Sequence, residues 1–190
     1  MTRIISGNAG GIRLDVPAAG TRPTSERVRE ALFSALEAAD AVDGARVLDL
    51  YAGSGALGLE ALSRGAATAT LVERGGPAAS IAQKNATRVI KVTGGRAAVQ
   101  RSTVVKYLEG SRETFDLVLI DPPYDLTESE LSQVLELLAP LLDPDALLVV
   151  ERGRRSPEPA WPVVVERIRD RVYGDTVMWW AQPRAESQSR

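Results

Sequence analysis

The sequence predicts an α/β fold built on a doubly wound, mostly parallel sheet of seven strands that ends in an antiparallel hairpin. From Ala45 onward, short apolar runs alternate with helical segments, which is typical of a parallel sheet covered on both faces. A glycine-rich turn follows the first of these runs, at the kind of position where such sheets bind nucleotides. The last two predicted strands have almost no helical stretch between them, so we expect them to pair antiparallel at one edge.

An N-terminal β-hairpin is predicted to precede this sheet. Apolar and polar residues alternate over 3–6 and 12–16, and a turn-rich segment separates the two stretches. A helix then follows, with Thr24 as its expected N-cap and Glu26 in its first turn. The expected organisation is a hairpin extension at 1–21, a sheet domain at 22–181 and a frayed tail at 182–190.

The remaining elements alternate in the order that a doubly wound fold requires. Pro77 is predicted to open one helix, and the capping box formed by Thr127 and Glu130 is predicted to open another. The predicted strands are 46–50, 68–73, 97–100, 115–120 and 146–151, followed by the hairpin strands 163–168 and 171–180, which join near 173–175.

Composition limits the classes of function that are open to this chain. It has 190 residues, 44% of them hydrophobic and 25% charged, as expected for one globular domain. It has no run of about 18 apolar residues and no signal-peptide pattern, so we expect a cytoplasmic protein without a membrane partner. Without Cys or His, thiolate nucleophiles, imidazole bases and most transition-metal sites are excluded, and we expect no metal.

The stretch from Asp49 to Gly58 carries the spacing of a nucleotide-binding turn. Gly53, Gly55 and Gly58, with Ser54 between the first two, would give a tight reversal, a close approach of ligand to backbone, and close packing of helix on strand. Both NAD enzymes and S-adenosylmethionine enzymes use this spacing. Asp49 favours the second, because a carboxylate would repel a pyrophosphate by about 1 to 4 kcal/mol and attract the ammonium of a methionyl group.

Glu73 closes the second predicted strand of the sheet. An acidic side chain at this distance after a glycine-rich turn can accept hydrogen bonds from ribose hydroxyls. NAD and S-adenosylmethionine both carry that ribose. Glu73 therefore supports a nucleoside ligand without choosing between the two.

Asp121, Pro122, Pro123 and Tyr124 follow a strongly apolar predicted strand. The two prolines stiffen the turn and remove two backbone N–H donors, so the turn is rich in acceptors. The Asp121 carboxylate and a proline carbonyl could each accept one N–H of an exocyclic amino group, which would direct the nitrogen lone pair toward an electrophile. Asp121 could also stabilise positive charge on that nitrogen. Tyr124 offers a ring on which a flat base could stack.

Positive charge is concentrated near the N-terminus, although the whole chain has a net charge of -2. An acidic protein can hold a nucleic acid only through a local basic patch. Residues 1–29 contain five arginines against two acidic residues, which leaves a local excess of three positive charges. The predicted nucleic-acid-binding residues are Arg3, Arg13, Arg22, Arg27 and Arg29. The alternatives are a solvated hairpin with scattered charges, or a nucleic-acid face along Arg152, Arg154 and Arg155.

Taken together, these motifs resemble a known family. The fold resembles the class I S-adenosylmethionine-dependent methyltransferases, which are Rossmann-like, and Asp-Pro-Pro-Tyr is a signature of amino-group methyltransferases. The segment 22–33, the turn continued through 58–65, and residues 121–124 together resemble the bacterial 16S ribosomal RNA guanine-N2 methyltransferases of the RsmD type. The resemblance runs from Arg3 to about Trp180.

The resemblance implies an enzyme that methylates the N2 amino group of a guanine in 16S ribosomal RNA, acting as a monomer on the RNA or on a small-subunit particle. Asp49, Gly53 and Gly55 would hold the methionyl part of S-adenosylmethionine, and Glu73 its ribose. Asp121 and Pro122 would hold the amino group while Tyr124 packs on the base. After the third strand such enzymes usually place Asp or Asn near the adenine, whereas this chain has Ser102 and Thr103, whose hydroxyls could substitute.

Two other classes of function stay open at this point. One is another amino-group methyltransferase, acting on DNA adenine N6 or on protein glutamine; the lack of a long target-recognition insert disfavours the DNA enzyme. The other is a non-enzymatic RNA-binding assembly factor that keeps a degenerate cofactor fold. Three intact carboxylates, Asp49, Glu73 and Asp121, argue against the latter because a degenerate site has no need of them.

Overall fold

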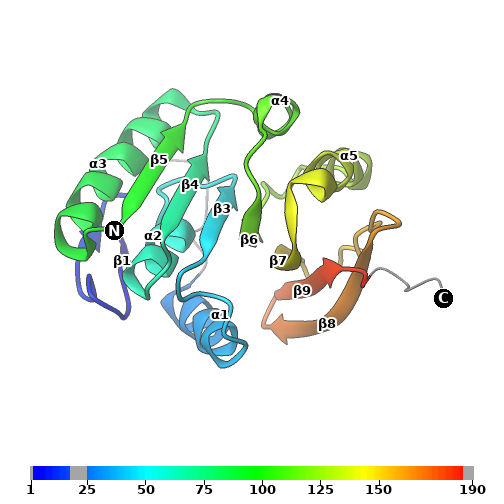
Figure 1. Ribbon diagram of the computed structural model, residues 1–190, viewed down its shortest axis with the longest axis horizontal. Helices are drawn as coiled ribbons and strands as arrows, with labels where there is room; N and C mark the ends of the chain where they lie inside the picture. The colour runs from blue at the N-terminus through cyan, green and yellow to red at the C-terminus, as the bar shows by residue number, and fades with distance from the viewer. Residues whose placement is uncertain (1, 18–24, 186–190) are drawn as a thin grey trace.

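A computed structural model describes residues 2–17 and 25–185 of the chain. A seven-stranded sheet has the order β5-β4-β3-β6-β7-β9-β8, in which β5, β4, β3, β6 and β7 are parallel and β9 runs antiparallel to its neighbours β7 and β8 (Figure 1). The predicted sheet and its terminal hairpin are therefore confirmed. The strands are β3 Arg46–Leu50, β4 Thr68–Val72, β5 Arg96–Gln100, β6 Phe115–Ile120, β7 Leu142–Gly153, β8 Val165–Tyr173 and β9 Thr176–Pro183.

Helices cover both faces of the sheet, as its apolar strands require. One face packs on helices α1, α2 and α3, and the other on α4, α5 and the short 3-10 helix η1. Alternate residues of a strand supply the two layers: Val47 packs with α1, whereas Leu48 packs with α5. The helices are α1 Glu26–Ala38, α2 Ala56–Ser63, α3 Gly76–Thr93, α4 Val104–Gly110, α5 Glu128–Leu138 and η1 Ala139–Leu141.

The N-terminal hairpin is present and lies against α2 and α3. Its strands β1 Thr2–Arg3 and β2 Arg13–Leu14 pair antiparallel, and Ile4 and Leu14 are fully buried among side chains of α2, α3 and the sheet. The carboxylate of Glu60, in α2, accepts the backbone N–H groups of Ile5 at 2.8 Å and Ser6 at 3.0 Å. The hairpin is thus fixed to the sheet domain by apolar packing and by a buried carboxylate.

Several element boundaries differ from the prediction. Ser25 is the N-cap of α1, since its hydroxyl accepts the Val28 N–H at 3.2 Å; Thr24 lies outside the described residues. β7 begins at Leu142, four residues earlier than predicted, because Asp143, Pro144 and Asp145 interrupt the apolar pattern without ending the strand.

At the C-terminal hairpin the predicted turn is found, but the bounds of both strands differ. β8 covers 165–173 where 163–168 is predicted, and β9 covers 176–183 where 171–180 is predicted. β8 continues to Tyr173 and meets β9 across the two-residue turn 174–175. β9 continues to Pro183, which pairs with Val165, so the predicted frayed tail begins with two paired residues; 186–190 lie outside the described residues. Across the described ranges, no helix is long and apolar enough to span a membrane.

Candidate functional site

The glycine-rich turn and the Asp-Pro-Pro-Tyr segment meet at the carboxyl edge of the sheet. The chain runs from β3 outward to β5 and then returns to β6 on the other side of β3, so the strand order reverses between β3 and β6. Leu50 pairs with Ile120 at the ends of these strands, and the Asp121 N–H lies 3.5 Å from the Leu50 carbonyl oxygen. Two segments far apart in the sequence therefore border one crevice.

A cavity of about 800 Å³ opens at this crevice, a size suited to a nucleoside-containing ligand. Both predicted motifs contribute to its wall, together with Pro17 from the N-terminal extension. Among the predicted residues, its lining contains Gly53, Glu73, Ser102, Thr103, Asp121, Pro122 and Tyr124, and it does not contain Asp49, Ser54, Gly55 or Gly58.

Asp49 is buried beneath the turn, with 1% of its surface exposed. Its Oδ2 accepts the Gly58 N–H at 2.9 Å, and a Cβ added to Gly58 would lie 2.3 Å from Leu71 Cδ2, which explains the glycine. Burial is the main cause that raises the pKa of Asp49 to about 7; the Gly58 N–H opposes this rise, and the nearby charges of Asp121 and Glu73 add to it. Asp49 therefore fixes the start of α2 against β3 and does not itself line the cavity.

Glu73 connects two loops at the edge of the cavity. Its Oε2 accepts the Gly53 N–H at 3.0 Å and its Oε1 accepts the Gly75 N–H at 2.6 Å. The carboxylate is half-buried and lines the cavity, and each of its oxygens has a second lone pair for a ligand hydroxyl. Glu73 therefore holds the loops that follow β3 and β4 and can accept hydrogen bonds from a ribose.

Ser102 and Thr103 lie in the next loop, between β5 and α4, and both line the cavity. The Thr103 hydroxyl accepts the Lys106 N–H at 3.3 Å and so serves as the N-cap of α4. Its position is thereby fixed. The Ser102 side chain is half-buried at the cavity wall, so it is the better placed of the two for a polar contact with a ligand.

The Asp-Pro-Pro-Tyr segment forms the opposite wall of the cavity. Pro122 is buried, whereas 80% of Tyr124 is exposed at the rim. The Pro123 carbonyl accepts the Leu126 N–H at 3.0 Å, which closes the turn. An exposed aromatic side chain next to an acceptor-rich turn is what stacking of a flat base would require.

Tyr51, which has no predicted role, and Arg152, which is predicted only as part of an alternative nucleic-acid face, also shape this wall. Tyr51 has a φ of 64°, which is unusual for a residue with a side chain and is typical of strained functional turns. Its side chain lines the cavity, and burial raises its pKa to about 12, so it stays protonated at neutral pH. Arg152, in β7, donates to the Leu126 carbonyl oxygen at 3.1 Å and pairs with Glu128, and so it braces the segment after Tyr124.

Sequence offered only weak signals for these two residues. Tyr51 stands inside the glycine-rich stretch, but its left-handed backbone follows from the three-dimensional turn and not from its residue type. Arg152 follows an apolar strand, where an arginine is expected to be exposed. Only 6% of its side chain is exposed, because Glu128 on α5 compensates its charge.

The predicted RNA-binding arginines differ in exposure and in pairing. Arg13 and Arg27 are exposed, Arg3 pairs with Glu26 at 3.2 Å, and none of the three lines the cavity. Arg29 has 1% exposure, so its prediction as an RNA contact is wrong for this conformation. Its guanidinium lies 3.6 Å from Glu60 and donates to the Thr2 hydroxyl and the Arg3 carbonyl, which makes it a link between α1 and the hairpin. Arg22 lies outside the described residues.

Comparisons with known proteins agree with this arrangement. Residues 2–182 match the family model described as Conserved hypothetical protein 95. The chain is 36% identical to ribosomal RNA small subunit methyltransferase D of Escherichia coli (strain K12), over 98% of this chain and 92% of that protein. It is also 36% identical to the protein of that name from Haemophilus influenzae, over 82% of this chain and 80% of the other.

The fold is shared with solved structures as well. The structure of yhhF from Escherichia coli superposes with a TM-score of 0.83 at 34% identity, covering 97% of this chain and 99% of that one. The fold is thus Rossmann-like, as predicted, with the N-terminal hairpin as an addition to the sheet domain. With a family model that matches almost the whole chain and relatives that match at this identity, this chain belongs to the RsmD family of ribosomal RNA small subunit methyltransferases.

Proposed function

We propose that this chain transfers a methyl group from S-adenosylmethionine to the exocyclic N2 amino group of a guanine in 16S ribosomal RNA. The proposal rests on one observation: a nucleotide-binding turn and Glu73 line the same cavity as the Asp-Pro-Pro-Tyr segment, which forms its opposite wall. The names of the relatives support small-subunit ribosomal RNA as the substrate. We further propose that the protein acts in the cytoplasm, as a monomer.

The residues around the cavity fit S-adenosylmethionine. Glu73 is a carboxylate at the cavity wall whose two oxygens are held by the Gly53 and Gly75 amides, so it offers oriented acceptors to the ribose diol. Gly53, Ser54 and Gly55 would hold the methionyl part, with Asp49 and Gly58 fixing the turn, and Ser102 or Thr103 would contact the adenine. When bound, the cofactor supplies an electrophilic methyl group.

The Asp-Pro-Pro-Tyr segment would hold and activate the amino group. The Asp121 carboxylate and the Pro122 carbonyl each accept one N–H, which fixes the amino group and directs its lone pair at the methyl carbon. The Pro122 carbonyl receives no hydrogen bond from residues 2–17 and 25–185, so it is available for this contact. Asp121 also stabilises the positive charge that develops on the nitrogen as the new bond forms.

The target base would be held by Tyr124 after it leaves its stack. Leaving the stack costs a few kcal/mol, and stacking on an exposed aromatic ring recovers about 1 to 3 kcal/mol. Arg152 would keep the loop of Tyr124 in place during this step, because it donates to the Leu126 carbonyl oxygen while Glu128 pairs with its guanidinium.

The test is methyl transfer from labelled cofactor to separate fractions of total RNA, DNA and protein, with and without assembled small-subunit particles, followed by nucleoside analysis. We expect label in N2-methylguanosine from small-subunit RNA. Label in N6-methyladenine of DNA or in protein glutamine would identify another amino-group methyltransferase. Binding of RNA with no transfer to any fraction would identify an assembly factor.

A further inference from the structure

The end of β7 forms an exposed basic turn at the rim of the cavity. Gly153 and Ser156 both line the cavity, and the Ser156 N–H donates to the Gly153 carbonyl oxygen at 2.9 Å. Arg154 and Arg155 form the tip of this turn, and both side chains are exposed. The turn therefore presents two adjacent guanidinium groups beside the entrance.

The backbone of this turn is fixed independently of the two side chains. The Arg154 N–H donates to the Asp175 carbonyl oxygen at 2.8 Å, which attaches the turn to the loop between β8 and β9. Thr176, which follows Asp175, also lines the cavity. The two guanidinium groups thus extend from a rigid support at the same carboxyl edge of the sheet as Asp121.

Neither side chain forms an ion pair within the described ranges, in contrast to four arginines that the fold uses structurally. Arg29, Arg46, Arg64 and Arg152 are each held by one or more carboxylates. Arg152 is close in sequence to the turn, but it is buried and paired with Glu128. No carboxylate among the described residues pairs with Arg154 or Arg155, so both charges are available to a ligand.

We propose that Arg154 and Arg155 bind phosphates of the RNA that flank the target guanine. The proposal rests on the proposed function and adds the surface on which the RNA docks. Guanidinium groups pair with phosphate oxygens in a bidentate manner, and phosphate contacts fix the register of a nucleic acid on a protein. With Tyr124 exposed on the same cavity rim, the turn holds the backbone while the base reaches Asp121.

An RNA partner suits this surface better than a protein partner. Two guanidinium groups at the tip of a fixed turn offer charge and planar donors, which match the oxygens of a phosphate. The cavity beside them already offers an exposed ring for a base. Phosphate and base recognition therefore adjoin on one surface, as binding of an unstacked nucleotide requires.

The experiment measures RNA affinity against salt concentration for the parent and for the double variant Arg154→Ala/Arg155→Ala. Each phosphate contact contributes about 0.7 to 0.9 to the slope of log affinity against log salt, so the slope should fall by about 1.4 to 1.8. If both proteins bind equally at 1 M salt, this difference corresponds to a roughly 25- to 60-fold loss of affinity near 0.1 M. S-adenosylmethionine affinity should stay the same.

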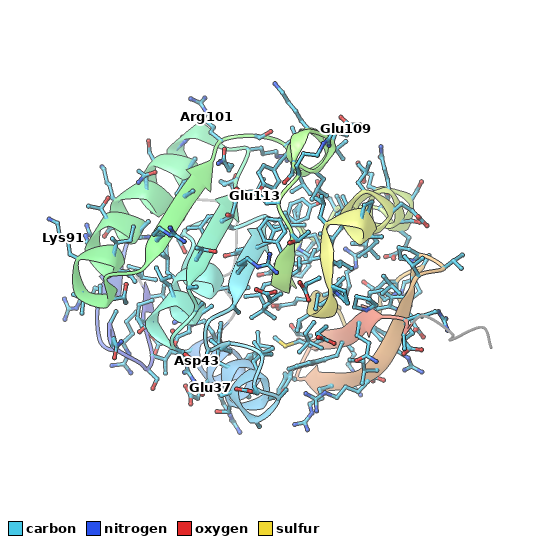
Figure 2. The ribbon with its side chains drawn as sticks, viewed as in Figure 1. Glu37, Asp43, Lys91, Arg101, Glu109 and Glu113 are labelled. Carbon is cyan, nitrogen blue, oxygen red and sulfur yellow. The ribbon has the colours of Figure 1, made fainter. Side chains whose placement is uncertain are left out.

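Two further variants separate charge from structure. Arg154→Lys/Arg155→Lys keeps both charges and should keep most of the salt slope. Lys91→Ala/Arg96→Ala removes two exposed charges that have no ion pair among the described residues; Lys91 lies in the last turn of α3 (Figure 2). This control should leave the salt slope near that of the parent.

The outcomes distinguish this proposal from the proposed function. If the parent methylates RNA and the alanine variant keeps the parent salt slope, the docking surface is wrong while the function stands. A lysine variant whose salt slope falls as far as that of the alanine variant would also overturn the proposal, because the slope would then not report the two charges. If the parent transfers no methyl group to RNA, the proposed function itself fails.

Discussion

The arginines near the N-terminus and those at the end of β7 are used in opposite ways. In the first region, Arg29 is buried against Glu60 and Arg3 pairs with Glu26, so positive charge holds the hairpin to α1 and α2. In the second region, Arg154 and Arg155 are exposed at a cavity rim, without ion pairs in the part of the chain that the structure describes. A local excess of arginine in a sequence therefore does not show which of the charges remain exposed and unpaired in the fold.

Carboxylates divide between the same two roles. Glu60 is fully buried and accepts the N–H groups of Ile5 and Ser6 as well as pairing with Arg29 and Arg64. Asp121 lies at the carboxyl edge of the sheet, on the wall of the cavity. Changes at Glu60 should therefore alter stability, whereas changes at Asp121 should alter chemistry.

The largest expected effect is that of Asp121→Ala. Loss of the acceptor that orients the amino group and stabilises its charge should reduce methyl transfer by about 10³- to 10⁴-fold. Affinity for S-adenosylmethionine should be retained, because of the two ligands Asp121 is expected to contact the amino group and not the cofactor. Labelled transfer and calorimetry measure the two quantities, with Glu109→Ala, an exposed change on α4, as the control (Figure 2). Turnover at the parent rate would make Asp121 a structural turn residue.

Glu60→Gln should have the next largest effect, and it should act on stability. It leaves the charge of Arg29 buried without a compensating carboxylate, which costs about 3 to 5 kcal/mol of unfolding free energy. Glu26→Gln is the matched control, since the exposed pair of Glu26 and Arg3 should contribute about 0 to 1 kcal/mol. Denaturant unfolding measures both. Equal losses in the two variants would mean that burial does not separate the two kinds of ion pair.

Sequence predicted the sheet and the site loops well, because local signals produce them. Apolar runs and capping residues determined the strands and helices, and the carboxyl-edge rule placed Glu73 and Asp121 at one crevice. Burial of Arg29 could not be predicted in the same way. It depends on Glu60, which is far away in the sequence and which only the packing of α2 against α1 and the hairpin brings near.

The same limit applies to Asp49. Its residue type and position suggested direct contact with a cofactor ammonium, but the bond to Gly58 places its carboxylate under the turn. Whether a strand-end carboxylate faces a cavity or supports its wall depends on how closely the following helix packs on the sheet. For α2, close packing requires that Gly58 lie against Leu71, which is not its neighbour in the sequence.

Asp49→Asn should change how the unfolding free energy depends on pH, and so test whether Asp49 is a buried structural carboxylate like Glu60. The folded-state pKa of about 7 lies above the ordinary aspartate pKa of 3.8, so Asp49 stabilises the fold at low pH and this contribution is lost as pH rises toward 7. Asparagine can still accept the Gly58 N–H but does not titrate. Between pH 5 and pH 7, the parent should therefore lose about 2 kcal/mol of unfolding free energy relative to the variant. Parallel pH profiles of the two proteins would show that Asp49 does not titrate in this range.

Arg3→Ala/Arg13→Ala should have the smallest effect of the four. Arg3 is already paired with Glu26, and neither arginine lines the cavity, so the hairpin can contribute little to holding RNA at the entrance. Arg13 is exposed and could reach one phosphate, so the salt slope of RNA affinity should fall by at most about 0.9. Cofactor affinity should stay the same, because the hairpin strands lie outside the glycine turn. A fall as large as that expected for Arg154→Ala/Arg155→Ala would show that the hairpin carries RNA after all, because ion pairs as exposed as that of Arg3 exchange readily for phosphate.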